Sequence, residues 1–236
     1  MKNRELREKA LSKVKVRIKG LTGASIIAYL CMALTLLAGD LTGNRLLDIA
    51  IELAAGFVLS LMAMAGYRRV GLTAWRTSSV SYADLAGCFT GLKRLAKGAA
   101  PALLSSIALT LVRQLAFGGI WYAAVIAVIA AVMLYIFAAY ICYAGEIDEM
   151  AGPGAAIAAG VSAAAGNMGR ILEMLVMLYW WVAAALAGAV LICRSSGVSD
   201  IPTTLVTFLV GLALCYLIAP YNALAEAGLG REIFKK

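Results

Sequence analysis

The chain contains no histidine, and this absence excludes a large part of enzyme chemistry. A nucleophile activated by histidine, a histidine proton shuttle and every metal site with imidazole ligands are ruled out. The phosphate-binding loop of the Walker A type is also missing. The sequence therefore predicts a protein that is not an enzyme and that needs no cofactor.

Charged residues and paired cysteines are scarce as well. Only 14% of the 236 residues are charged, against about a quarter in soluble domains. None of the five cysteines forms a CxxC pair, and most of them lie within apolar runs. We therefore expect neither a disulfide framework nor a zinc site, and we predict that the cysteines act as small buried apolar residues.

Apolar residues dominate what is present, with 63% hydrophobic residues and a mean hydropathy of +0.88. A helix of about 20 apolar residues crosses a hydrocarbon core of about 30 Å, and lipid excludes unpaired backbone groups. We therefore predict an all-α, polytopic membrane protein with six transmembrane helices and amphipathic interfacial helices on the cytoplasmic side. The transmembrane domain, residues 21–221, has its spans at residues 21–38, 46–65, 99–117, 120–143, 171–192 and 203–221.

The basic residues fall mostly on one side of these spans. With the N-terminus inside, only Arg45, Arg113 and Arg194 of the 21 lysines and arginines lie on the outer side. Lysine and arginine collect on cytoplasmic loops, so both chain ends are predicted to be cytoplasmic. The net charge of +8 is explained by this bias and by the anionic inner leaflet, so nucleic acid is not expected as a partner.

Two segments flank the predicted transmembrane domain on the inner side. Residues 1–20 place Leu6, Ala10 and Val14 on one helical face among many basic residues. This pattern predicts a basic amphipathic helix lying on the inner leaflet. Residues 222–236 are predicted to be a cytoplasmic tail.

The first candidate site consists of polar groups at membrane depth. Exposing such groups to lipid is energetically unfavourable, so they usually face protein or water. Glu52 in span two and Arg113 in span three lie at similar depth, so they are expected to form an ion pair. Ser106 and Thr110 continue the face of Arg113. The pair either fixes helix register or lines an outward-facing pocket that binds an anionic or zwitterionic group through Arg113.

The second candidate site is a stripe in span five. Glu173, Met177 and Trp180 follow helical spacing down one face, and Ala184 and Gly188 continue it. Because a lipid-facing stripe would hardly begin with a carboxylate, this face is predicted to point inward. Trp180 then either fills the centre of the bundle or lines a cavity for a hydrophobic ligand such as lipid or peptide.

Span six carries hydroxyl and small residues on one face, at Thr204, Thr207, Gly211 and Cys215. Such faces let helices approach closely, so helix packing is the first interpretation. Thr207 is nevertheless included among the candidate ligand contacts.

Three carboxylates follow span four, at Glu146, Asp148 and Glu149. They could hold a divalent cation, but the spacing of a calcium loop is missing. A solvated acidic loop that pairs with the basic inner surface is the favoured interpretation, and no metal site is predicted.

Four stretches together resemble a group of bacterial membrane proteins known as domain-of-unknown-function family 975. The resemblance rests on ELREKALSKVKVRIKG, GLTAWRTSSVSYADLAGCFTGLKRLAKGAAPALL, GNMGRILEMLVMLYWW and LIAPYNALAEAGLGREI, in this order. It implies a six-helix protein of the bacterial inner membrane. It implies no activity, because none is assigned to the family.

These observations favour a non-enzymatic integral membrane protein that binds or passes a small amphipathic molecule, or that assists a membrane complex. Its expected partners are membrane lipids and either such a ligand or another membrane protein. The alternatives are an assembly factor that organises the inner leaflet and, less favoured, a lipid-modifying enzyme that uses carboxylates such as Glu173.

Overall fold

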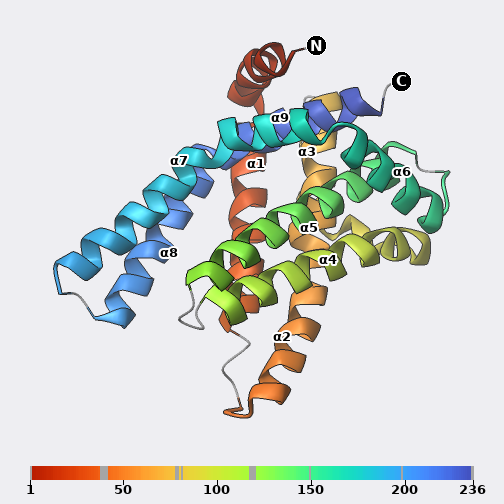
Figure 1. Cartoon of the computed structure of the whole chain (residues 1–236). Helices are drawn as coiled ribbons and strands as arrows, with labels where there is room; N and C mark the ends of the chain where they lie inside the picture. Colours follow the sequence, from red (N-terminus) through yellow and green to blue (C-terminus); the bar gives the residue numbers. More distant parts are fainter. Residues whose placement is uncertain are drawn as a thin grey trace.

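The computed structural model describes residues 2–37, 42–77, 80, 82–116, 121–148, 150–197 and 199–234. Its ordered elements in these ranges are helices, which confirms the predicted all-α class (Figure 1). Residues 39–41 and 118–119, which lie between predicted spans, are outside the described residues. Four cysteine side chains are described, and all four are thiols, with Cys31, Cys142 and Cys193 buried as expected.

Five of the helices are long and apolar enough to cross a membrane, and a bent helix pair makes a sixth crossing if it counts as one span. The protein is therefore a multi-span helical membrane protein, as the hydropathy predicted. The five spans are Arg17–Thr35, Arg45–Arg76, Leu92–Gln114, Val125–Ile147 and Met168–Cys193. The bent pair joins Pro202–Leu217 to Ala219–Ile233 at an angle of 58°.

The first helix corrects the predicted boundary at residue 20. Helix α1 runs without a break over Asn3–Leu37, so the basic segment and the first span are one helix. Leu6 and Ala10, which were predicted to face lipid, are fully buried in the main protein core. The Lys13 Nζ atom donates to the carbonyl oxygen of Trp75, 2.5 Å away. The same atom lies 4.8 Å from the centre of the Trp75 ring. Burial and the nearby charges of Arg17 and Lys9 lower the pKa of Lys13.

The second span is longer than predicted and is interrupted by a π-helix. Helix α2 (Arg45–Ser60) continues through the π-helical segment η2 (Leu61–Gly66) into α3 (Tyr67–Arg76). A π-helical turn is rare, and it occurs frequently at functional sites. The short 3-10 helix η3 (Tyr82–Phe89) packs on η2. A side chain on Gly66 would overlap the carbonyl oxygen of Leu85 in η3, so this position requires glycine.

The segment predicted to be a tail is a buried helix. Helix α8 (Asp200–Leu217) ends in a sharp bend, and α9 (Ala219–Ile233) then crosses α1 and α3. Every residue from Asn222 to Gly230 is buried. The prediction of a tail over residues 222–236 was therefore wrong for the described part. Figure 1 shows α9 lying across the end of the molecule at which α1 begins.

The remaining helices form two hairpins. Helices α4 (Leu92–Ala116) and α5 (Trp121–Ile147) pack along each other, and α6 (Pro153–Gly166) covers the end of α5. Helix α7 (Met168–Ser195) pairs with α8 and leans away from the bundle in Figure 1. Only 6% of the most apolar window of α7 is buried, against 33–39% in the other four long spans.

Candidate functional site

The predicted ion pair between Glu52 and Arg113 is present. The Arg113 Nη1 atom donates to Glu52 Oε2 at 2.8 Å, and the Glu52 side chain is 0% exposed. The buried residues of α2 are Asp48, Glu52, Gly56 and Ser60, so the polar face of this helix points into the protein and its apolar face points outward. This inverted pattern is what a membrane helix requires when its polar groups serve the protein interior.

Ser106 and Thr110 lie on the face of α4 that meets α2. The Ser106 Oγ atom donates to the carbonyl oxygen of Leu53 at 3.0 Å. A Cβ on Gly56 would lie 2.6 Å from the Ser106 Oγ atom, so α2 and α4 are in close contact there. Thr110 Oγ1 and Glu52 Oε1 are buried, and neither has a hydrogen-bond partner in the described part of the chain. The structure thus brings together four of the predicted site residues, while their role in ligand binding stays a prediction.

The predicted inward stripe on α7 was wrong. Trp180 is 64% exposed and Met177 is also exposed. The helix instead packs through Ile171, Met174 and Leu178, a face rotated from the predicted one. The prediction assumed that the Glu173 carboxylate must face the protein interior. Glu173 is instead exposed, and its Oε2 accepts a hydrogen bond from Asn3 Nδ2 at 2.9 Å. A polar side chain from α1 satisfies this carboxylate, so its charge does not require the rest of the stripe to face inward.

Thr207 also takes no part in a common site with these residues. Its hydroxyl donates to the carbonyl oxygen of Thr203 in its own helix at 2.8 Å. The same face of α8 meets α1 at Gly211, where an added side chain would overlap the ring and hydroxyl of Tyr29. Span six therefore uses its small residues for helix packing.

A second buried ion pair, which the sequence analysis missed, lies between α3 and α9. The Arg68 Nη1 atom is 2.5 Å from Glu226 Oε2, and the two side chains are only 3% and 7% exposed. Arg68 is the second residue after the π-helical segment, and Glu226 lies in the helix that follows the sharp bend. The pair therefore joins two helical segments that lie next to interruptions, α3 after the π-helical segment and α9 after the bend.

Tyrosines surround this pair, which we call the Arg68–Glu226 pair throughout. Arg68 Nη2 donates to the Tyr135 hydroxyl, which in turn donates to both carboxylate oxygens of Glu226, 3.3 and 3.4 Å away. The Tyr179 hydroxyl donates to Glu226 Oε1. The guanidinium carbon of Arg68 lies 4.9 Å from the ring centre of Tyr135 and 5.8 Å from that of Tyr143. Hydrogen bonds and cation–π contacts thus stabilise both charges in a site from which bulk water is excluded.

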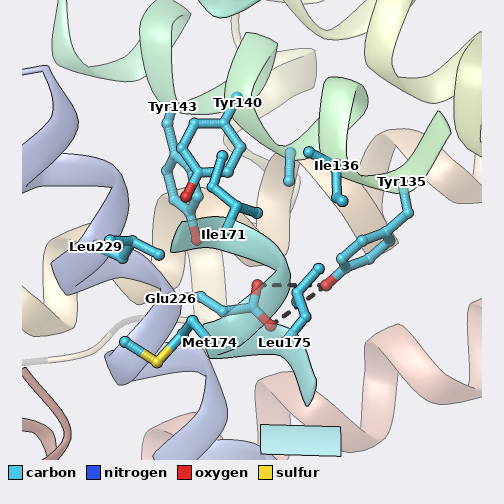
Figure 2. A pocket seen from close by; sticks show the side chains of 10 residues that line it. Tyr135, Ile136, Tyr140, Tyr143, Ile171, Met174, Leu175, Glu226 and Leu229 are labelled. Atoms are coloured by element: carbon cyan, nitrogen blue, oxygen red, sulfur yellow. Dashed lines mark hydrogen bonds between the residues drawn. The ribbon is translucent and has the colours of Figure 1, made fainter. Parts of the chain in front are cut away.

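A small cavity opens beside the Glu226 carboxylate. Its volume is about 10 Å³, which is close to the minimum for one water molecule. Figure 2 shows Glu226 pointing toward Tyr135 at one side of the cavity, with Tyr140 and Tyr143 on the other. Apolar side chains complete the wall, namely Ile136, Ala139, Ile171, Met174, Leu175 and Leu229. A charged group is therefore presented to a space with aromatic and aliphatic walls.

Two polar atoms near the pair lack partners among the described residues. Arg68 Nε is a buried donor, and Asn222 Oδ1 is a buried acceptor. Asn222 lies one helical turn before Glu226, and its Nδ2 donates to the carbonyl oxygen of Leu178 at 3.2 Å. Buried polar groups without a partner are uncommon, and they mark places where a water or a ligand group would be stabilised.

Small residues hold α9 close enough for this arrangement. A Cβ on Gly228 would lie 2.7 Å from the ring of Trp75, and one on Gly230 would lie 2.6 Å from the ring of Tyr143. The stretch NALAEAGLG has alanine or glycine at most positions. That pattern is typical of close helix packing, and it is the signal in the sequence that could have identified α9 as a core element.

The acidic residues after span four that the structure describes have partners within the protein. Glu146 Oε2 lies 3.9 Å from Arg69 Nε, and Asp148 Oδ1 accepts from the backbone of Met150 and Ala151. Glu149 lies outside the described residues. Within the described ranges, no group of three or more metal-ligating side chains occurs.

Comparisons of the chain with protein-family models, with curated proteins and with solved structures found no match. Membership of family 975 therefore stays a prediction from the sequence motifs.

Proposed function

We propose that this protein is a non-enzymatic integral membrane protein that binds a small amphipathic molecule at the Arg68–Glu226 pair. The observation that carries the proposal is the position of the pair. Arg68 is the second residue after the π-helical segment, and Glu226 lies in α9, the helix that follows the 58° bend after α8. Ionisable groups inside membrane proteins usually serve function, and binding sites of transporters are typically built where helices are interrupted.

The proposal includes passage of the ligand through a change at the two interruptions. The cavity beside Glu226 has a volume of about 10 Å³, which is room for about one water molecule, so a larger ligand needs the site to widen. The π-helical segment and the α8–α9 bend lie on the two elements that carry the charges. Movement at either interruption would separate Arg68 from Glu226 without unfolding the rest of the bundle.

A second candidate function is assistance to a membrane complex through the α7–α8 hairpin. The observation that favours it is that only 6% of the most apolar stretch of α7 is buried, far less than in the other long spans. Trp180 stands on this exposed surface. Lipid alone can cover such a surface, so this function ranks second to ligand binding.

We also propose a location in the bacterial inner membrane with both chain ends in the cytoplasm. The family resemblance supports the first part, and the distribution of lysine and arginine supports the second. In a cysteine-free variant, single cysteines at Lys2 and Phe234 are expected to react with a membrane-impermeant maleimide only after lysis. A cysteine at Asn44 should react in intact spheroplasts. Labelling of either end in intact spheroplasts contradicts the orientation.

Ligand binding is tested by the thermal unfolding of the full chain in nanodiscs, measured with a panel of amino acids, short apolar peptides and lipids. A ligand at the proposed site raises the unfolding temperature of the wild type, and the shift should disappear in Glu226→Gln. The control is Glu8→Gln, which removes the exposed Arg4–Glu8 pair and should keep the shift. Equal loss in both variants, or no shift with any compound, contradicts the proposed function.

A further inference from the structure

The chemistry of the Arg68–Glu226 pair restricts what can enter the site. Both charges are more than nine-tenths buried, and separating one charge from its partner inside a protein leaves the other uncompensated, which is strongly unfavourable. A ligand that displaces Arg68 from Glu226 must therefore supply a positive group to the carboxylate. It must also supply a negative group to the guanidinium.

The carboxylate side of the pair suits a positive group. The cavity lies against Glu226, and its wall includes the rings of Tyr135, Tyr140 and Tyr143 (Figure 2). Aromatic faces attract cations, and the guanidinium of Arg68 already uses two of these rings in this way. An ammonium group placed in the cavity would meet the same carboxylate and the same kind of rings.

The guanidinium side of the pair suits a negative group. Arg68 Nε is a buried donor without a partner in the described part of the chain. If Glu226 turns to another cation, Nη1 also becomes available. Nε and Nη1 donate from different edges of the guanidinium, so a carboxylate or phosphate oxygen can accept from either one.

We propose that the ligand is a zwitterion with an apolar part. Its ammonium group pairs with Glu226, its carboxylate or phosphate pairs with Arg68, and its apolar part lies against Ile136, Ile171 and Leu229 in the widened cavity. The site then remains neutral before and after binding. This inference rests on the proposed function and names the ligand class for the same site.

The test compares compounds that share one apolar side chain but differ in charge. Leucine is the zwitterion, leucinamide keeps only the positive group, and N-acetylleucine keeps only the negative group. Affinity is measured by thermal unfolding and by calorimetric titration of the full chain in nanodiscs. Leucine should bind at least about tenfold more tightly than either singly charged compound. Leucinamide or N-acetylleucine binding as tightly as leucine overturns the inference.

A second arm distinguishes a free zwitterion from a lipid headgroup. Nanodiscs of phosphatidylethanolamine supply the same ammonium and phosphate groups, while phosphatidylglycerol supplies the phosphate alone. If the ligand is a lipid, phosphatidylethanolamine nanodiscs should raise the unfolding temperature and abolish leucine binding. If it is a free molecule, leucine should bind equally in both lipids. The inference also fails if neither leucine nor phosphatidylethanolamine changes the unfolding temperature.

Variants separate this inference from the proposed function. Glu226→Gln should weaken the binding of leucine about tenfold or more and leave the affinity for N-acetylleucine unchanged. Arg68→Gln should weaken the binding of leucine to a similar extent and leave the affinity for leucinamide unchanged. Glu8→Gln, in the exposed Arg4–Glu8 pair, is the control and should leave all three affinities unchanged. Binding that depends on Glu226 but is strongest for leucinamide contradicts the zwitterion and leaves the proposed function standing.

Discussion

Replacing Glu226 by alanine is expected to lower the free energy of unfolding by about 3–5 kcal/mol. The substitution leaves the Arg68 guanidinium buried without a counter-charge, and it removes the acceptor of Tyr179. Arg68→Ala should have an effect of similar size, because it leaves the carboxylate unpaired. The measurement is equilibrium unfolding of the full chain in mixed micelles, followed by circular dichroism.

The exposed Arg4–Glu8 pair in α1 provides the control. Exposed ion pairs contribute little, so Glu8→Ala should change the free energy of unfolding by less than about 1 kcal/mol. The charge-swapped variant Arg68→Glu with Glu226→Arg should recover part of the stability lost in the single variants. Single variants that are as stable as Glu8→Ala would show that the buried pair is not important for the fold.

Gly66→Ala is the second substitution with a large expected effect. The added methyl group would overlap the backbone carbonyl of Leu85, and backbone atoms have little room to move. We expect a loss of about 3 kcal/mol, because overpacking of this kind outweighs the gain in helix propensity. Since Arg68 follows two residues later, a displaced η2 should also weaken its contacts with Glu226.

Gly188→Ala is the matched control for Gly66→Ala. Gly188 lies within helix α7, and nothing stands within 4 Å of the place where its Cβ would be. Its substitution should leave stability unchanged or raise it by up to about 1 kcal/mol. Both variants can be compared by the same unfolding measurement, and equal effects would contradict the close contact between η2 and η3.

Hydropathy predicted the spans well because the membrane imposes one strong physical requirement, that a long apolar segment forms a helix. The Glu52–Arg113 pair was predicted for a related reason. Glu52 lies within an apolar run and Arg113 near the end of another, so their unusual polarity identified them and their depths matched. Both predictions depended only on local composition.

The Arg68–Glu226 pair could not be predicted in the same way. Arg68 follows the predicted end of span two, where basic residues normally mark a cytoplasmic loop. The π-helical segment rotates the following residues about the helix axis relative to a regular α-helix. Regular helical spacing from residues 46–65 therefore does not predict which side of the helix Arg68 lies on. Glu226 lies in a short, weakly apolar segment that is stable as a helix because α1 and α3 bury it.

Trp180 illustrates a different limit of sequence patterns. Its stripe has the spacing of a helix face, but spacing alone does not tell whether a membrane helix turns that face to protein or to lipid. The buried face of α7 is the one with Ile171, Met174 and Leu178, which looks no more apolar than the exposed one. In lipid both faces are apolar, so the usual contrast between core and surface is missing.

The account depends most on a direct energetic coupling between Arg68 and Glu226. A double-mutant cycle with Arg68→Gln, Glu226→Gln and the double variant measures it, using the free energy of unfolding in mixed micelles. We predict a coupling of about 2 kcal/mol or more, because the double variant leaves no unpaired charge. A coupling near zero would mean that the two side chains do not act as a pair, and both the proposed site and its zwitterionic ligand would then lose their basis.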